Sequence, residues 1–199
     1  EALDRPSVLI MGWPPEPSPT DWVHTDSLNG GRLAARCLLE LGHRRLACYS
    51  SRAAHAGFQQ RVDGFKHVAA EANRAASGSS SPRVRLFSDS AKLARALRGT
   101  TRPTAIFATS DREALEAIAA VRRVGLRVPE EVSVVGFDGS VLAELSDPPL
   151  TTIFADREAT GARAAVALVE RIEGRCSGPP REIITAVALQ AGGTTARGR

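Results

Sequence analysis

Cysteine is scarce in this sequence, with three residues in 199, and no two of them show the CxxC spacing of a zinc or redox site. Cys37 and Cys48 lie in apolar runs, where an unpaired cysteine behaves as a small hydrophobic side chain. We therefore interpret all three, Cys176 included, as structural. A reducing cytoplasm is the simplest compartment for such a chain, although few cysteines also suit a periplasmic protein.

Long apolar runs are absent as well, because no stretch approaches the ~20 residues that cross a bilayer. The first residues show no basic region followed by an apolar core, so no signal peptide is expected. Aromatic residues make up 5% of the chain, too few for a platform that stacks single-stranded nucleic acid. The net charge of +4 is spread over scattered pairs such as Arg44–Arg45, which favours a solvated surface over a nucleic-acid groove.

Signatures of catalysis and of metal binding are missing too. The sequence has no GxGxxG after a strand, no GxxxxGK[ST] phosphate loop and no GxSxG elbow. Gly30 and Gly31 lie inside a helical pattern and do not form such a loop. The four histidines are isolated from other ligands at metal-binding spacing. We therefore expect no enzyme activity, no metal and no cofactor.

What the sequence does contain is a regular alternation of strand-like and helix-like patterns. The strand-like runs lie at 8–11, 46–49, 84–87, 105–108, 132–137, 150–154 and 183–189. The helical patterns lie at 26–41, 58–76, 91–97, 111–124 and 158–173. A proline-rich loop is expected at 13–22 and a flexible turn at 77–83. This alternation predicts an α/β fold of doubly wound parallel sheets.

The helical patterns also predict caps and faces. Asp26 and Asp111 each stand where a helix N-cap is expected. The last helical pattern places small and β-branched apolar residues on one face: Ala162, Ala165, Val166, Val169 and Ile172.

Five segments appear in order and carry a resemblance to a known family. They are LLELGHRRLACYS (38–50), RVDGF (61–65), PTAIFATSD (103–111), GLRVPEEVSVVGFD (125–138) and PPLTTI (148–153). Together they resemble the effector-binding core of the lactose/galactose-repressor (LacI/GalR) family of bacterial transcription regulators, from about Val8 to Thr194. The resemblance implies a periplasmic-binding-protein-like core in which two α/β lobes hinge around a ligand.

The same resemblance implies that this chain is a fragment or a natural truncation. Residues 1–25 and 155–185 correspond to part of the first lobe, and residues 26–154 and 186–199 to a nearly complete second lobe. The helix-turn-helix headpiece and most of the first lobe are expected to be absent.

Arg61 and Asp138 are the leading candidates for ligand binding. The family places an arginine at Arg61, and a guanidinium suits adjacent hydroxyls or a carboxylate. The alternative is a surface arginine paired with Glu71 or Asp63. Asp138 directly follows the strand at 132–137, at the edge where an open α/β sheet binds ligands, and its carboxylate can accept hydrogen bonds from sugar or nucleoside groups. The alternative for Asp138 is a turn residue before a glycine.

Five further residues complete the predicted ligand site: Ser110, Phe87, Asp89, His55 and Phe58. Ser110 stands where the family often has asparagine. Phe87 and Asp89 lie at the end of another strand, and Phe87 offers an aromatic face to a sugar or base, although a core position is the competing interpretation. His55 and Phe58 lie in the stretch before Arg61, where specificity residues cluster in the family.

The sequence therefore predicts the ligand-sensing core of a repressor that is a homodimer when intact. Its small effector would be a sugar, a sugar phosphate or a nucleoside, and operator DNA would be bound only through the missing headpiece. The alternative is a periplasmic sugar-binding protein that serves a transporter. The GHRRL and GLRVPEEVSVVGFD stretches favour the regulator.

Overall fold

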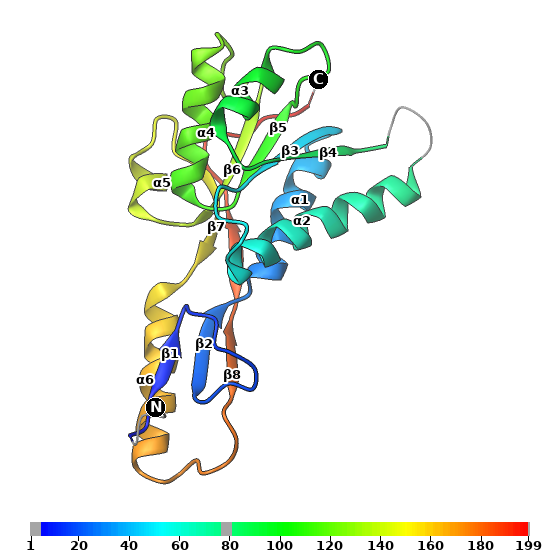
Figure 1. The fold of residues 1–199 in the computed structure, drawn as a ribbon. Helices are drawn as coiled ribbons and strands as arrows, with labels where there is room; N and C mark the ends of the chain where they lie inside the picture. Colours follow the sequence, from blue (N-terminus) through cyan, green and yellow to red (C-terminus); the bar gives the residue numbers. More distant parts are fainter. Residues whose placement is uncertain (1–4, 77–80, 199) are drawn as a thin grey trace. The chain divides into compact units, whose positions relative to one another are not determined.

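A computed structural model describes residues 5–76 and 81–198, so residues 77–80 of the expected turn lie outside the described residues. The chain divides into two compact units. The first unit comprises residues 1–26 and 155–187, and the second comprises residues 27–154 and 188–199. Figure 1 shows their helices and strands. No helix in the described part of the chain is long and apolar enough to cross a membrane.

The first unit contains a three-stranded parallel sheet in the order β1-β2-β8, and helix α6 packs against β1 and β2. Its elements are β1 (Val8–Ile10), β2 (Asp21–Thr25), β8 (Glu182–Thr185) and α6 (Arg157–Ile172). The loop predicted at 13–22 was too long, because Asp21 and Trp22 open β2. Pairing on both sides makes β2 the central strand, and all five of its residues are buried.

Helix α6 buries a different face from its most apolar one. The buried positions are Thr160, Ala164 and Ala167, whereas Val166 and Ile172 are exposed. Small side chains on the buried face let the helix axis lie close to the sheet. The apolar pattern of this helix therefore did not indicate its packing face.

The second unit contains a six-stranded sheet in the order β4-β3-β5-β6-β7-β9, with parallel pairing from β4 to β7. The strands are β3 (Arg45–Tyr49), β4 (Arg83–Phe87), β5 (Ala105–Ala108), β6 (Ser133–Asp138), β7 (Thr151–Ala155) and β9 (Val187–Gln190). The single strand predicted at 183–189 is two strands in different sheets, β8 and β9. One residue, Ala186, separates them where the chain leaves the first unit.

Helices cover both faces of this sheet, so the predicted doubly wound α/β fold is confirmed. They are α1 (Ser27–Glu40), α2 (Ala56–Ala75), α3 (Ser90–Leu97), α4 (Asp111–Arg123) and the short α5 (Val141–Leu145), which the sequence did not predict. On one face of the sheet, Ala47 and Ile106 pack against α3 and α4. On the α2 side, the rings of Phe65 and Phe107 stack at 5.1 Å.

Helices α1 and α2 touch backbone to backbone through two glycines. A Cβ atom at Gly31 would overlap the carbonyl oxygen of Arg61, and one at Gly64 would overlap the carbonyl oxygen of Leu28. Only glycine permits this approach without a shift of one helix. The RVDGF segment therefore fixes the position of α2, and with it the Arg61 backbone.

His43 joins the amino ends of the strands to the last residues of the chain. Its Nε2 lies 3.0 Å from both the Ser133 hydroxyl and the Ala196 carbonyl, and its Nδ1 lies 3.1 Å from the Thr104 hydroxyl. Burial lowers the pKa of this imidazole, so the neutral form is favoured. The histidine of the GHRRL segment thus has a structural role.

Candidate functional site

A group of polar side chains lies where β3, β5 and β6 of the second unit end. In an open α/β sheet, ligands bind beyond the carboxyl ends of the parallel strands. Thr109 follows β5 directly, Asp138 is the last residue of β6, and Ser50 follows β3. Arg61 comes from the second turn of α2 and reaches this edge of the sheet.

Arg61 is buried, with 5% of its surface exposed. Its Nη1 donates to the Thr109 carbonyl at 2.6 Å and to the Asp138 carboxylate at 3.3 Å, while its Nε donates to the Ser27 hydroxyl at 3.4 Å. The guanidinium carbon lies 3.6 Å from the centre of the Phe137 ring, within the range of a cation–π contact. The alternative of a surface arginine was therefore wrong.

The predicted surface partners of Arg61 bind elsewhere. Glu71 pairs with His67, and Asp63 accepts a hydrogen bond from Gln59, all on α2. Burial lowers the pKa of Arg61, and the carboxylate of Asp138 opposes this. A guanidinium remains protonated under such conditions, so the site holds a fixed positive charge with little surrounding water.

Asp138 has an unusual backbone conformation. Its φ of 120° lies outside the regions that L residues commonly adopt, and Gly139 follows with a φ of 63°. Such strain persists only where the surroundings enforce it, and it is frequent at binding sites. The Asp138 side chain is 25% exposed, so its carboxylate contacts both Arg61 and solvent.

Glu113, which the sequence interpretation missed, organises the floor of the site. It is buried and accepts hydrogen bonds from the Ser51 backbone and hydroxyl, both at 2.7 Å. It also accepts from the hydroxyls of Thr109 at 2.6 Å and Ser110 at 3.2 Å. A glutamate three residues after a capping serine is a sequence signal that could have identified it.

Asp111 is not the cap of α4, contrary to the prediction. Ser110 is the N-cap, and its side chain accepts a hydrogen bond from the Glu113 backbone. Asp111 is instead buried and accepts from the Ser140 backbone at 2.7 Å and from the Thr152 hydroxyl at 2.5 Å. It therefore holds the loop that follows Asp138.

Phe58 is the one remaining candidate that contacts Arg61. The Arg61 guanidinium carbon lies 4.9 Å from the centre of its ring, and the His55 ring lies 6.4 Å from that of Phe58. The structure thus brings together Arg61, Asp138 and Phe58, with His55 beside them.

Phe87 and Asp89 have other contacts. Phe87 is half-buried against the core under α3 and α4, with the Arg85 guanidinium 5.1 Å from its ring. Asp89 caps α3 by accepting hydrogen bonds from the Lys92 and Ala91 backbone, which lower the pKa of its carboxyl. Among the described residues, no group of three or more His, Cys, Asp or Glu could hold a metal ion.

Residues 35–195 match the model of the periplasmic binding protein-like domain. The HTH-type transcriptional repressor PurR of Vibrio vulnificus is 37% identical over 174 residues, which cover 86% of this chain and 52% of that protein. The PurR of Vibrio campbellii is 36% identical over 180 residues, covering 88% and 54%. The chain thus spans about half the length of these curated relatives.

Two solved structures extend the comparison. A LacI family transcriptional regulator from Enterococcus faecalis with bound ribose has a TM-score of 0.81 and 27% identity, covering 98% of this chain and 70% of that one. A complex of the transcriptional regulator CelR with cellobiose has a TM-score of 0.77 and 25% identity, covering 95% and 65%. The chain belongs to the periplasmic binding protein-like domain family and corresponds to the effector-binding core of LacI-type regulators.

Proposed function

We propose that this chain is the ligand-sensing part of a bacterial transcription repressor and that its effector binds beside Arg61 and Asp138. The observation that carries the proposal is the buried Arg61, which points a permanent charge at the carboxyl edge of the six-stranded sheet. Its hydrogen bonds to the residues that the structure describes use Nη1 and Nε. The Nη2 donors are then suited to effector oxygens, and Asp138 to effector hydroxyl or N–H groups.

This donor and acceptor pair supports one class of effector. Neighbouring hydroxyls of a sugar can accept from the guanidinium and donate to the carboxylate at the same time. The Phe58 ring offers an apolar face beside them. We propose a sugar, a sugar phosphate or a nucleoside, and the relatives whose structures contain ribose and cellobiose support this class.

Binding alone would perform this function, without catalysis. An effector that binds one state of the regulator better than the other shifts the equilibrium between them and changes the affinity for operator DNA. We propose that the DNA contact is made by a headpiece outside this sequence and that the protein works in the cytoplasm. A sugar-binding protein of a transporter remains the second candidate, but the matched relatives named above are regulators.

We further propose that the intact protein is a homodimer and that α5 contributes to the interface. Val141 and Leu145 of this short helix are 63% and 78% exposed, and Leu142 is 40% exposed. Neighbouring exposed apolar side chains of this kind are typical of interaction surfaces. Leu145→Glu is expected to lower the molecular mass measured by light scattering in the full-length protein, and an unchanged mass would contradict this assignment.

The effector assignment is tested by calorimetric titration with pentoses, hexoses, their phosphates and nucleosides. Asp138→Asn keeps the size of the side chain but removes its charge, so we expect at least about tenfold weaker binding of any sugar or nucleoside that the native protein binds. Asp63→Asn, on the exposed side of α2, is the matched control and should leave the affinity unchanged.

Two outcomes would overturn the proposal. If Asp138→Asn is folded by circular dichroism and binds the effector as tightly as the native protein does, the effector does not bind at Asp138. Binding of a sugar by a full-length protein that carries no DNA-binding segment would instead favour the transport receptor.

A further inference from the structure

An arginine-lined pocket lies at the amino-terminal ends of strands β3 and β4, opposite to the ends that carry the polar site. It has a volume of about 520 Å³ and is lined by Arg44, Arg45, Leu46, Ser81, Arg83, Arg85, Thr101 and Pro103. Arg45 and Arg83 are the first residues of β3 and β4. Since β3 has five residues, roughly 13 Å of strand separate this pocket from the polar site at the carboxyl edge.

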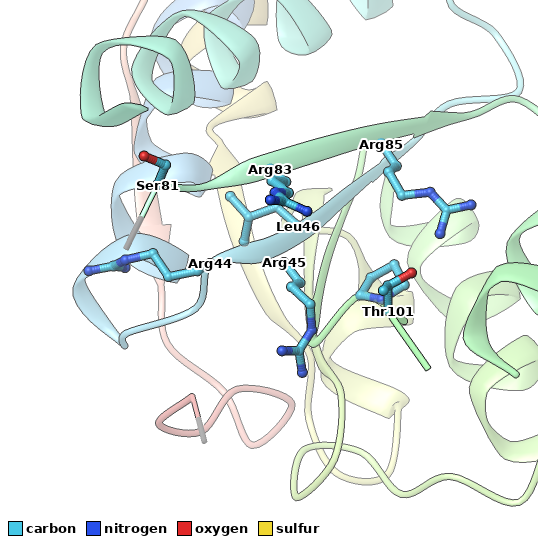
Figure 2. A pocket seen from close by; sticks show the side chains of 8 residues that line it. Arg44, Arg45, Leu46, Ser81, Arg83, Arg85 and Thr101 are labelled. Atoms are coloured by element: carbon cyan, nitrogen blue, oxygen red, sulfur yellow. The ribbon is translucent and has the colours of Figure 1, made fainter. Parts of the chain in front are cut away.

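The strand register concentrates positive charge on one face of the sheet. Arg45 pairs with Arg83, and Ala47 pairs with Arg85, so these three arginines project from the same face. Partner residues on neighbouring strands lie only ~5 Å apart, a separation at which like charges repel. Figure 2 shows the Arg45 and Arg85 side chains extending to the same side of the two strands.

In the part of the chain that the structure describes, Arg44, Arg45, Arg83 and Arg85 form no ion pairs with carboxylates. The contacts that do exist are with neutral groups. Arg45 donates to the Arg102 carbonyl at 2.9 Å, and Arg44 to the carbonyls of Leu39 and His43.

The pocket exists because the helix layer ends before it. Phe87, at the carboxyl end of β4, is covered by the core under α3, whereas Arg83 and Arg85 on the same strand are exposed. Charged residues on an edge strand also prevent pairing with other chains. That role would explain the arginines of β4, but it does not explain Arg45, because β3 is paired on both sides.

We propose that this pocket binds a small anion that carries two or more phosphate groups, at a site separate from the effector site. One guanidinium can donate two parallel hydrogen bonds to one phosphate, so three arginines on one face suit more than one phosphate group. Thr101 and Pro103 line the same pocket. The volume lies in the range of sites for small ligands, which suits a nucleotide better than a macromolecule.

The test is calorimetric titration of the native chain with inorganic tripolyphosphate and, separately, with ATP at low ionic strength. We expect binding with a Kd below about 1 mM and at least about tenfold weaker binding by the double variant Arg83→Gln/Arg85→Gln. Tighter binding of ATP than of tripolyphosphate would assign the apolar part of the pocket to the nucleoside, and equal binding would restrict the site to the phosphates.

Matched variants separate the pocket from general charge effects. Arg74→Gln/Arg95→Gln removes two charges from exposed positions on α2 and α3 and should leave the affinity unchanged. Arg83→Lys/Arg85→Lys keeps the charge but not the paired donors, so an intermediate affinity is expected. Absence of binding by the native chain, or equal weakening by both glutamine variants, would overturn the proposal. A short DNA duplex that binds more tightly than ATP through Arg83 and Arg85 would do the same.

Discussion

Each unit of this protein encloses an arginine–carboxylate arrangement, but the two units bury opposite partners. In the first unit the Asp21 side chain is fully buried, while Arg171 and Arg181 reach it from positions that are 17% and 35% exposed. In the second unit Arg61 is the buried partner, at 6%, and Asp138 is 25% exposed. The charge that is sealed from water is thus negative in one unit and positive in the other.

The difference lies in which groups bond to each buried charge. Both oxygens of Asp21 accept hydrogen bonds from Arg171 and from Arg181, at 2.6 to 3.2 Å. Arg61 donates to the Asp138 carboxylate at 3.3 Å, and to the neutral Thr109 carbonyl at 2.6 Å and Ser27 hydroxyl at 3.4 Å. A buried ion pair stabilises a fold only when its remaining bonding capacity is satisfied. The first arrangement is therefore structural, whereas the second leaves its carboxylate partly exposed to solvent.

The largest effect is expected for Asp21→Asn. Loss of the carboxylate leaves two guanidinium groups without their shared partner, and we expect the first unit to lose about 3–5 kcal/mol of stability. Urea unfolding followed by tryptophan fluorescence measures this, because both tryptophans, Trp13 and Trp22, belong to that unit. Glu170→Gln breaks only the partly exposed bond to Arg181 and should cost less than about 1 kcal/mol. Equal losses of stability in Asp21→Asn and Glu170→Gln would contradict the structural role assigned to Asp21.

A second pair of variants compares the helices of the two units. Gly64→Ala places a methyl group on the Leu28 carbonyl oxygen, so α1 and α2 must separate, and we expect a loss of about 3 kcal/mol. Gly161→Ala, in α6, meets no atom within 4 Å and should raise stability by up to about 1 kcal/mol. Chemical denaturation followed by circular dichroism measures both, and a tolerated Gly64→Ala would show that the two helices can move apart.

Low pH should destabilise the two units by protonating different groups, Asp21 in the first and His43 in the second. Burial raises the pKa of Asp21, but hydrogen bonds from Arg171 and Arg181 outweigh it and lower the value to about 2, from 3.8. The stability that ionised Asp21 contributes to the first unit is complete above about pH 4. About 2 kcal/mol of it is lost as the pH falls towards 2. Burial lowers the pKa of His43, so the second unit starts to lose stability below about pH 6.5, where the unfolded chain binds the proton.

Two probes separate these acid transitions. Tryptophan fluorescence should report the acid transition of the first unit below pH 4, and that transition should be missing in Asp21→Asn. Far-ultraviolet circular dichroism includes the second unit and should show a stability change that begins at higher pH. A tryptophan transition near pH 6 would contradict the assignment to Asp21.

A smaller loss of stability than in Asp21→Asn and Gly64→Ala is expected for Asp138→Asn. The amide keeps an acceptor for Arg61 and remains partly solvated, so we expect a loss below about 1.5 kcal/mol, well under that of Asp21→Asn. Thermal denaturation of both variants under one set of conditions measures the difference. A loss of stability in Asp138→Asn as large as that in Asp21→Asn would show that this carboxylate supports the fold, and it would weaken the proposed role of Asp138 in binding.

Much of the second unit could be predicted because its strands are short apolar runs with a helical pattern between them. The strand at 105–108 and the buried face of α2, with Val62, Phe65 and Val68, agree with that pattern. The first unit was harder to interpret. A proline-rich stretch concealed the start of β2, and the apolar side of α6 did not indicate its packed side.

The prediction of Arg61 rested on the resemblance of the RVDGF segment, and that of Asp138 on its place at the end of a strand. Arg61 and Asp138 lie together as two charged residues of opposite sign. Glu113 was missed because a glutamate in a helix is ordinarily a solvated residue, and its burial depends on contacts with Ser51 and Thr109 from two other strand ends. Asp111 was misassigned because Ser110, one residue earlier, caps equally well.

The backbone contact at Gly31 restricts how the proposed effector site could acquire a new specificity. The atom that a side chain at position 31 would strike is the carbonyl oxygen of Arg61 itself, so any larger residue there would displace the peptide that carries the guanidinium. Substitutions at His55 and Phe58 would change the surroundings of the arginine without moving it. An engineer would therefore vary the start of α2 to change ligand choice, and would substitute Gly31 only to move the anchor of the site.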